Sequence, residues 1–283
     1  MSWTQVRTPR GTFGVRLHGG PGNVSPLVVC VHGFPDDAST WDGLAEVLVS
    51  AGYQVAAMNL RGYVPSPQAG PLGLDDLVAD LLAVIDALSP RAPVHLVGHD
   101  YGAQLAYPTL ARAPHRFRRA VLLSGAHPAF VQRNARRSLR QLWMSRYIVF
   151  FQLGRRADRR VAADDFAYVD RLWRRWSPAF HFPAEHREHM KNTLRASMPG
   201  PVAMYRAGGF SVPAEPIPVP TLYITGTDDG CALPLLAEGQ NALFTHEYRN
   251  ETWQGVGHFP HLEQPQRTGA AITSWIAASS GSP

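Results

Sequence analysis

The chain has 283 residues, 45% of them hydrophobic, and a net charge of +5 at pH 7. This length and composition predict a globular protein, either one α/β domain with an insertion or two small domains. No run reaches the roughly 18 apolar residues of a membrane span, and the opening MSWTQVRTPR lacks the apolar core of a signal peptide. We therefore expect a soluble cytoplasmic protein.

The positive charge belongs to one segment. Residues 127–215 hold 16 basic and 7 acidic side chains, while the rest of the chain is net acidic. Aspartates interrupt the arginines at helical spacing, which favours a solvated, ion-paired helical face over a nucleic-acid site. All basic residues except Lys191 are arginine, a bias that suggests a GC-rich bacterial genome. The two cysteines, Cys30 and Cys231, lie in different parts of the chain, which favours reduced thiols.

The elements follow a pattern of short apolar runs alternating with amphipathic ones, as in a parallel sheet with connecting helices. The predicted strands are 13–18, 27–34, 53–60, 94–100 and 119–126, with helices at 40–51, 74–88 and 102–112. From residue 127 the pattern becomes helical and aromatic. Alternation resumes at 220–229, followed by a helix over 233–243, a strand near 246–253 and a helix near 264–277. The simplest account is one α/β sheet with a helical insertion between two strands.

The stretch VGHDYG at 97–102 matches a G-x-S-x-G nucleophile elbow, with Asp100 in place of the serine. Taken alone, an aspartate before a helix is most simply an N-cap. Gly98 and Gly102, however, permit the close packing of an elbow. Three further motifs follow other predicted strands, where open α/β sheets bind ligands: HGFPDD (32–37), GTDD (226–229) and GVGHFPHLEQP (255–265). The order nucleophile, acid, histidine is that of α/β-hydrolases.

With these motifs and RGY at 61–63, the chain resembles the α/β-hydrolase family over nearly its whole length, most closely the soluble epoxide hydrolase branch. The resemblance implies a mostly parallel twisted sheet flanked by helices. It divides the chain into a core domain, residues 1–126 and 216–283, and an inserted helical cap, or lid, at 127–215. It also implies that Asp100 is the nucleophile, His258 the base and Asp229, rather than Asp228, the acid that orients His258.

A carboxylate nucleophile restricts the class of electrophile that the protein can attack. Attack on an acyl carbon would give an anhydride, whereas attack on an sp3 carbon that bears a leaving group gives an alkyl ester. Epoxides and alkyl halides are therefore the fitting electrophiles, and His258 would activate the water that hydrolyses the ester. The backbone N–H groups of Phe34 and Tyr101 are the expected oxyanion hole.

Epoxide opening also requires an acid for the ring oxygen, and epoxide hydrolases of this family use two cap tyrosines. Tyr205, in MYRA, resembles the second of these. Phe150 stands where the first is expected, so Tyr147, one helical turn earlier, is the candidate for the missing hydroxyl, and Tyr168 is a weaker one. Either could instead be a packing residue.

The positions that hold a halide or a substrate carboxylate in dehalogenases are Phe34, Tyr101 and Gln104, and none matches those families. We therefore expect an epoxide hydrolase that acts on a small apolar epoxide and water. A dehalogenase with the same nucleophile, or a non-catalytic ligand-binding homologue, is the alternative.

No cofactor motif is present, and EHREH at 185–189 matches no metalloprotease pattern, which favours a solvated helix face without a metal. We expect no nucleic-acid or membrane partner. The protein is expected to be a monomer or homodimer.

Overall fold

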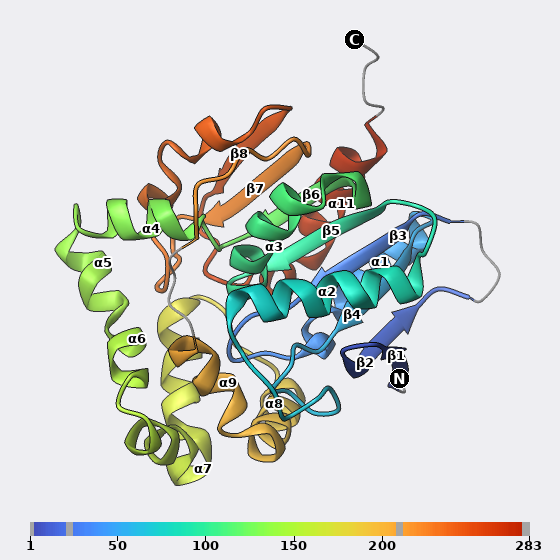
Figure 1. Ribbon diagram of the computed structural model, residues 1–283. Helices are drawn as coiled ribbons and strands as arrows, with labels where there is room; N and C mark the ends of the chain where they lie inside the picture. The colour runs from blue at the N-terminus through green and yellow to red at the C-terminus, as the bar shows by residue number, and fades with distance from the viewer. Residues whose placement is uncertain (1–2, 21–24, 208–211, 279–283) are drawn as a thin grey trace.

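The computed structural model describes residues 3–20, 25–207 and 212–278. Across this part of the chain, an eight-stranded sheet runs through the centre of the molecule (Figure 1). Its strands are β1 (Thr4–Thr8), β2 (Gly11–His18), β3 (Leu27–Val31), β4 (Gln54–Met58), β5 (Val94–His99), β6 (Phe117–Leu123), β7 (Thr221–Gly226) and β8 (Tyr248–Trp253). The strand order is β1-β2-β4-β3-β5-β6-β7-β8.

Strands β3 to β8 pair in parallel, while β1 and β2 form an antiparallel edge against β4. Both β5 and β7 are buried along their whole length, because helices cover the two faces of a parallel sheet. The register pairs Val31 with Gly98 and Gly226 with Trp253. The loops that follow β3, β5, β7 and β8 consequently leave the sheet at one edge.

Two pairs of helices flank the sheet (Figure 1). Helices α1 (Asp42–Ser50) and α11 (Pro265–Ala277) pack against one face and share a buried cluster that includes Leu44 and Ile272. Helices α2 (Leu74–Leu88) and α3 (Tyr101–Arg112) pack against the other face, in the cluster that also reaches the insertion. The shorter turns of this core are 3₁₀ segments at Ala38–Trp41 and Pro114–Arg116 and helix α10 (Pro260–Glu263).

The residues between β6 and β7 form a separate group of helices, drawn at the lower left of the sheet in Figure 1. They are α4 (Pro128–Ala135), α5 (Leu139–Met144), α6 (Arg146–Phe151), α7 (Arg155–Trp176), α8 (Ala184–Ser197), α9 (Gly200–Ala203) and a 3₁₀ turn at Met204–Arg206. Non-helical backbone at residues 163–166 interrupts α7. The predicted helical insertion is therefore present, and we call helices α4 to α9 the cap.

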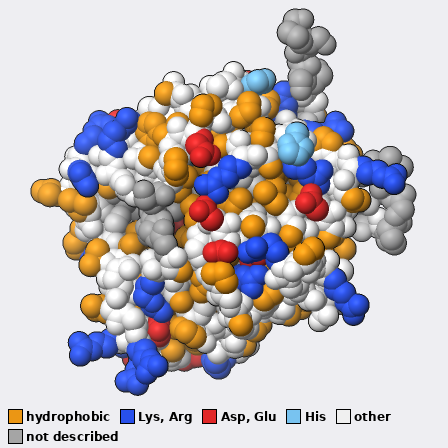
Figure 2. All heavy atoms as spheres, viewed as in Figure 1, with side chains coloured by type: hydrophobic (Ala, Val, Ile, Leu, Met, Phe, Trp, Pro, Cys, Tyr) orange, Lys and Arg blue, Asp and Glu red, His pale blue; other side chains and the backbone are white. Residues whose placement is uncertain are grey.

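The aspartates of the cap form ion pairs, but only one of these pairs has the helical spacing on which the prediction is based; the others join residues far apart in the sequence. Asp158 pairs with Arg206, Asp164 with Arg160, and both Asp165 and Asp170 pair with Lys191. The remaining arginines give this region its basic surface, visible at the lower left of Figure 2. The EHREH segment is less solvated than expected, because His189 Nε2 lies 3.1 Å from Asp37 Oδ2 of the core.

Two details of the core differ from the predicted elements. The helix expected over 233–243 is a pair of 3₁₀ turns, Pro234–Ala237 and Gln240–Leu243. Gly239, with φ of 82°, adopts a left-handed conformation between them and ends the first turn. Strand β1 was not predicted, because only Val6 of its five residues is buried and the run is too short for a clear alternation.

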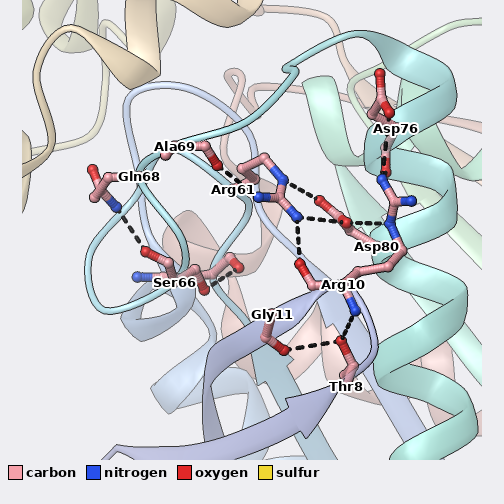
Figure 3. Close-up of polar contacts among 10 residues, drawn as sticks. Thr8, Arg10, Gly11, Arg61, Ser66, Gln68, Ala69, Asp76 and Asp80 are labelled. Carbon is pink, nitrogen blue, oxygen red and sulfur yellow. Dashed lines mark hydrogen bonds and ion pairs between the residues drawn. The ribbon is translucent and has the colours of Figure 1, made fainter.

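The arginine of the RGY motif anchors a loop rather than a site (Figure 3). Arg61 donates two hydrogen bonds to Asp80 of α2, at 2.7 and 2.9 Å, and others to the carbonyl groups of Ala69 and Arg10. The Arg10 side chain also donates to Asp80. This network ties the loop after β4 to α2 and to the turn between β1 and β2. In the described residues, no helix is long and apolar enough to cross a membrane.

Candidate active site

Asp100 stands on a strained turn between β5 and α3. Its φ of 51° and ψ of −116° lie in a region that residues with a side chain rarely adopt. The side chain makes no capping hydrogen bond, so the helix-cap interpretation is wrong. Glycine is required on both sides, because a Cβ on Gly98 would lie 2.7 Å from the Gly102 oxygen and a Cβ on Gly102 would collide with the Val31 carbonyl. This geometry is that of a nucleophile elbow.

The loop after β3 brings a backbone donor to Asp100. The Phe34 N–H donates to Asp100 Oδ1 at 3.1 Å, and the Tyr101 N–H also hydrogen-bonds the Asp100 carboxylate. The loop approaches this closely only because Gly33 has no Cβ, which would collide with the Asp100 side chain. Both expected oxyanion donors, the N–H groups of Phe34 and Tyr101, therefore face the Asp100 carboxylate, and Oδ1 accepts the hydrogen bond from Phe34.

His32 holds this loop in place. Its Nδ1–H donates to the Gly33 carbonyl at 2.9 Å, and its Nε2 accepts from the Leu60 N–H at 3.2 Å. The ring is fully buried, and burial lowers its pKa below the ordinary value. A neutral His32 is the form that these two hydrogen bonds require.

His258 lies between two carboxylates. Its Nδ1 is 2.8 Å from Asp229 Oδ2, and its Nε2 is 3.4 Å from Asp100 Oδ2. The second oxygen of Asp229 accepts hydrogen bonds from the N–H groups of Cys231 and Ala232, which fixes the carboxylate. By contrast, Asp228 is exposed and accepts a hydrogen bond from its neighbour. The structure thus brings Asp229, and not Asp228, to His258.

The charges of this group are coupled. Burial lowers the pKa of His258, but the charge of Asp229, the neighbouring Cys231 and the hydrogen bonds to Asp100 and Asp229 outweigh burial and hold that pKa well above the ordinary value. Burial raises the pKa of Asp100, yet hydrogen bonding and charge from His258 bring it below its usual range. We conclude that Asp100 is an ionised carboxylate and that its charge helps to keep His258 protonated.

The cap and the loop after β8 hold the His258 backbone. The His258 N–H donates to Ser177 Oγ at 2.9 Å and lies 3.1 Å from the Trp176 carbonyl, while its own carbonyl accepts from His99 Nε2. Burial and the charge of His258 lower the pKa of His99 to about 3, so His99 is neutral. Glu263 accepts from the Ser177 hydroxyl and from backbone N–H groups on both sides of His258.

These supporting residues were missed from the sequence. Glu263 is part of the HLEQP run quoted for the resemblance, so its place five residues after His258 was a usable signal. Trp176 and Ser177 end a cap helix far from the motif in sequence, and nothing local marks them. His261, expected to be a packing residue, is buried, stacks on Trp41 and bonds Thr40.

Aromatic side chains of the cap cover the Asp100 carboxylate. Helix α6 turns Tyr147 and Phe151 inward, and Tyr205 lies between them, with ring centroids 5.9 Å from Tyr147 and 5.1 Å from Phe151. Phe34 of the core stacks edge-on against Tyr205 at 5.8 Å. Phe150, the position at which a tyrosine was expected, instead faces Tyr168 at 5.3 Å.

The two inward tyrosines are neutral hydroxyls. Burial raises the pKa of both hydroxyls well above the ordinary value; the next cause is the charge of Asp100 for Tyr205 and the neighbouring Cys231 for Tyr147. Tyr147 is 5% exposed and Tyr205 is 4% exposed. Tyr168 is half-buried beside Arg146 and Arg171 and lines a separate arginine-rich hollow. Two hydroxyl donors thus lie in the aromatic wall above Asp100, and Tyr168 lies away from it.

The arrangement brings together the Asp100 carboxylate, a buried imidazole paired with a second carboxylate, two backbone N–H donors and two neutral tyrosine hydroxyls. In the described part of the chain, one group of His, Cys, Asp or Glu side chains has three ligand atoms close enough for a metal ion: Asp100, Cys231 and His258. Cys231 was not singled out from the sequence, because only the fold brings it to Asp100.

The chain is similar in sequence to proteins named as epoxide hydrolases. Epoxide hydrolase A of Mycobacterium tuberculosis (strain ATCC 25618 / H37Rv) is 27% identical, with 94% of this chain and 95% of that protein aligned. Mouse epoxide hydrolase 4 is 25% identical over 89% of this chain and 73% of that protein.

Solved structures match over almost the whole chain. Epoxide hydrolase A from Mycobacterium thermoresistibile gives a TM-score of 0.77 at 25% identity and 98% coverage of both chains. A structure from a study of novel epoxide hydrolases in metagenomes from hot environments gives 0.84 at 24% identity, covering 98% of this chain and 99% of that one. Residues 28–271, most of the chain, match the sequence pattern of the alpha/beta hydrolase family. The chain therefore belongs to the α/β-hydrolase family.

Proposed function

We propose that the protein is an epoxide hydrolase that opens a small apolar epoxide to a vicinal diol, with water as the second substrate and no cofactor. One observation carries the proposal: an ionised Asp100 whose Oδ1 accepts from the Phe34 N–H while Oδ2 lies 3.4 Å from His258 Nε2. A carboxylate placed in this way suits attack on an sp3 carbon. The likeness to epoxide hydrolases of known sequence supports the choice of electrophile.

In the first step, Asp100 Oδ2 attacks a ring carbon of the epoxide and the carbon–oxygen bond of the ring breaks. The ring oxygen takes a proton from a tyrosine hydroxyl, so that it leaves as an alcohol and not as an alkoxide. Tyr205 and Tyr147 are the proposed donors, since both are buried, neutral and within reach of the charge on Asp100. The product of this step is an alkyl ester on Asp100.

In the second step, His258 removes a proton from water and the hydroxide attacks the Asp100 carbonyl carbon. Ester formation removes the negative charge of Asp100 and so lowers the pKa of His258. The ring then gives its Nε2 proton, through water, to the tyrosinate left by the first step, and Nε2 can act as a base. The tetrahedral oxyanion forms on the oxygen that faces Phe34 and Tyr101, and one such donor is typically worth about 3 kcal/mol. Collapse of this intermediate releases the diol and restores the Asp100 carboxylate.

A panel of aryl and alkyl epoxides, haloalkanes and haloacids tests this function. Diol formation from apolar epoxides without halide release from the haloalkanes and haloacids is expected, and Asp100→Asn should lose it while keeping the wild-type circular dichroism spectrum. Halide release without diol would identify a dehalogenase. Binding of an epoxide with neither product would identify a ligand-binding homologue.

A further inference from the structure

Cys231 lies beside the two side chains that react most directly in the proposed mechanism. Its side chain is buried, and its Sγ is 3.6 Å from the Tyr147 hydroxyl oxygen. One ligand atom each from Asp100, Cys231 and His258 lie within 4.8 Å of one another. The proposed hydrolysis has no step for this thiol.

A thiolate, an imidazole and a carboxylate are a good ligand set for a borderline or soft divalent cation. Three protein ligands with a fourth position open to water are typical of reactive zinc sites. Ligand atoms around a tetrahedral Zn²⁺ are about 3.3–3.7 Å apart, so movements of about 1 Å suffice to bring these three onto one ion. Two anionic ligands would balance the charge of the cation.

The histidine is already oriented for such a ligand. Its Nδ1 is committed to Asp229, which leaves Nε2 for the ion, and a carboxylate in this position is the usual support for a metal-binding histidine. Nε2 is buried and lies 3.4 Å from Asp100 Oδ2, one of the other two proposed ligands. Asp100 and Cys231 are each 6% exposed, so both lie largely out of solvent.

We propose that Asp100, Cys231 and His258 form a binding site for one Zn²⁺ or Cd²⁺ ion, and that the bound ion stops turnover. The Cys231 thiol and the protonated His258 ring each lose one proton to solvent when the metal–sulfur and metal–nitrogen bonds form. The ion occupies the carboxylate oxygen that attacks the epoxide and the ring nitrogen that activates water. Mg²⁺ and Ca²⁺ prefer oxygen ligands and should neither bind here nor inhibit.

Cadmium titration of the full-length protein tests the site directly. We expect one Cd²⁺ per chain by calorimetry, with the ultraviolet charge-transfer absorption of a cadmium–thiolate bond. Cys231→Ser should lose the absorption and weaken binding by at least about tenfold, since even the loss of a supporting group costs a metal site 10- to 100-fold. Cys30→Ala is the matched control, because Cys30 is buried in β3, and it should retain both signals.

Inhibition is measured for each protein as its rate of diol formation with Cd²⁺ relative to its own rate without Cd²⁺. Cd²⁺ should abolish wild-type diol formation, EDTA should restore it, and Cys231→Ser should resist. Should Cys231→Ser not fold, Asp100→Asn replaces it: this variant should keep the absorption but bind Cd²⁺ more weakly.

An absorption that is absent from the wild-type protein, or that survives Cys231→Ser, overturns the proposal, as does turnover unaffected by bound Cd²⁺. The inhibitory part rests on the proposed hydrolase function. The cadmium–thiolate absorption and the heat of binding measure Cd²⁺ binding even if the protein turns over no epoxide. Failure of the metal site and failure of the hydrolase function are therefore distinguished.

Discussion

Tyr205 and Tyr147 are the residues whose roles the geometry distinguishes most clearly from packing. Both rings lie in the aromatic wall above Asp100, whereas Tyr168 stacks on Phe150 outside it. General acids typically contribute about 10²- to 10⁴-fold to a rate. Tyr205→Phe and Tyr147→Phe should each lower the rate of ester formation by about 10²-fold in stopped-flow single turnovers. Tyr168→Phe is the control, and an equal loss in that variant would argue for packing alone.

The charge of Asp100 sets the protonation of His258. Since the two carboxylates raise the pKa of His258, Asp100→Asn should lower it by removing one of them, and a neutral ester on Asp100 should do the same. NMR titration of the imidazole, assigned with His258→Gln, measures the shift. An unchanged pKa in Asp100→Asn would contradict the coupling on which the hydrolysis step depends.

At the scale of elements, the loop after β4 depends on a buried ion pair. Arg61 and Asp80 are both buried, and Arg61 donates two of the three hydrogen bonds that Asp80 accepts from arginine, the third coming from Arg10 (Figure 3). Because Asp80 keeps its pair with Arg10, Arg61→Ala should lower the free energy of unfolding by about 2–3 kcal/mol in urea denaturation, less than the loss of an unshared buried pair. Arg112→Ala, which breaks a pair with the exposed Asp75, should cost less than about 1 kcal/mol.

Helix α8 of the cap is joined to the core by a contact that depends on pH. The hydrogen bond and charge of Asp37 raise the pKa of His189, with Arg16 and Asp42 nearby acting in opposite directions. Burial raises the pKa of Asp37, but His189, Thr193 and Ser39 together lower it.

This contact should stabilise the fold most between about pH 4 and pH 6.5, the ordinary pKa values of the two groups. Below that window Asp37 becomes protonated, and above it His189 loses its proton as the pH passes its raised pKa. The unfolding free energy lost in His189→Ala should therefore be largest in this window and should vanish at alkaline pH. Thr193→Val removes a donor that does not titrate, so its cost should stay constant above the window. A flat difference for His189→Ala would rule out the ion pair.

The elements that sequence reasoning predicts well are those whose pattern repeats over many residues. Helix α2 begins and ends where its apolar spacing predicts, and β5 with its elbow follows from an apolar run and two glycines. The residues 233–243 have a helical pattern as well, but Gly239 breaks the backbone there, and periodicity does not record that. In α6, the inward face includes Tyr147 and Phe151 because cap packing sets the rotation of the helix.

At the scale of the whole molecule, the site residues that can be predicted from the sequence are those in the loops that directly follow strands. Parallel strands bring Phe34, Asp100, Asp229 and His258 to the same edge of the sheet. The motifs that contain these residues therefore predict, without further information, that the four residues lie close together. Cys231 belongs to the core loop after β7, two residues beyond Asp229, whereas the contact of Trp176 with this group depends on how the cap docks. Such docking joins residues far apart in the chain, and no local pattern encodes it.

The central claim is that Asp100 forms a covalent ester that His258 hydrolyses. Intact-protein mass spectrometry of the His258→Gln variant, mixed with an epoxide that the wild-type protein converts, tests this most directly. We expect the protein to gain the mass of one epoxide, peptide mapping to place the addition on Asp100, and Asp100→Asn in the same background to show none. Accumulation of diol without any adduct, or an adduct on another residue, would contradict the claim.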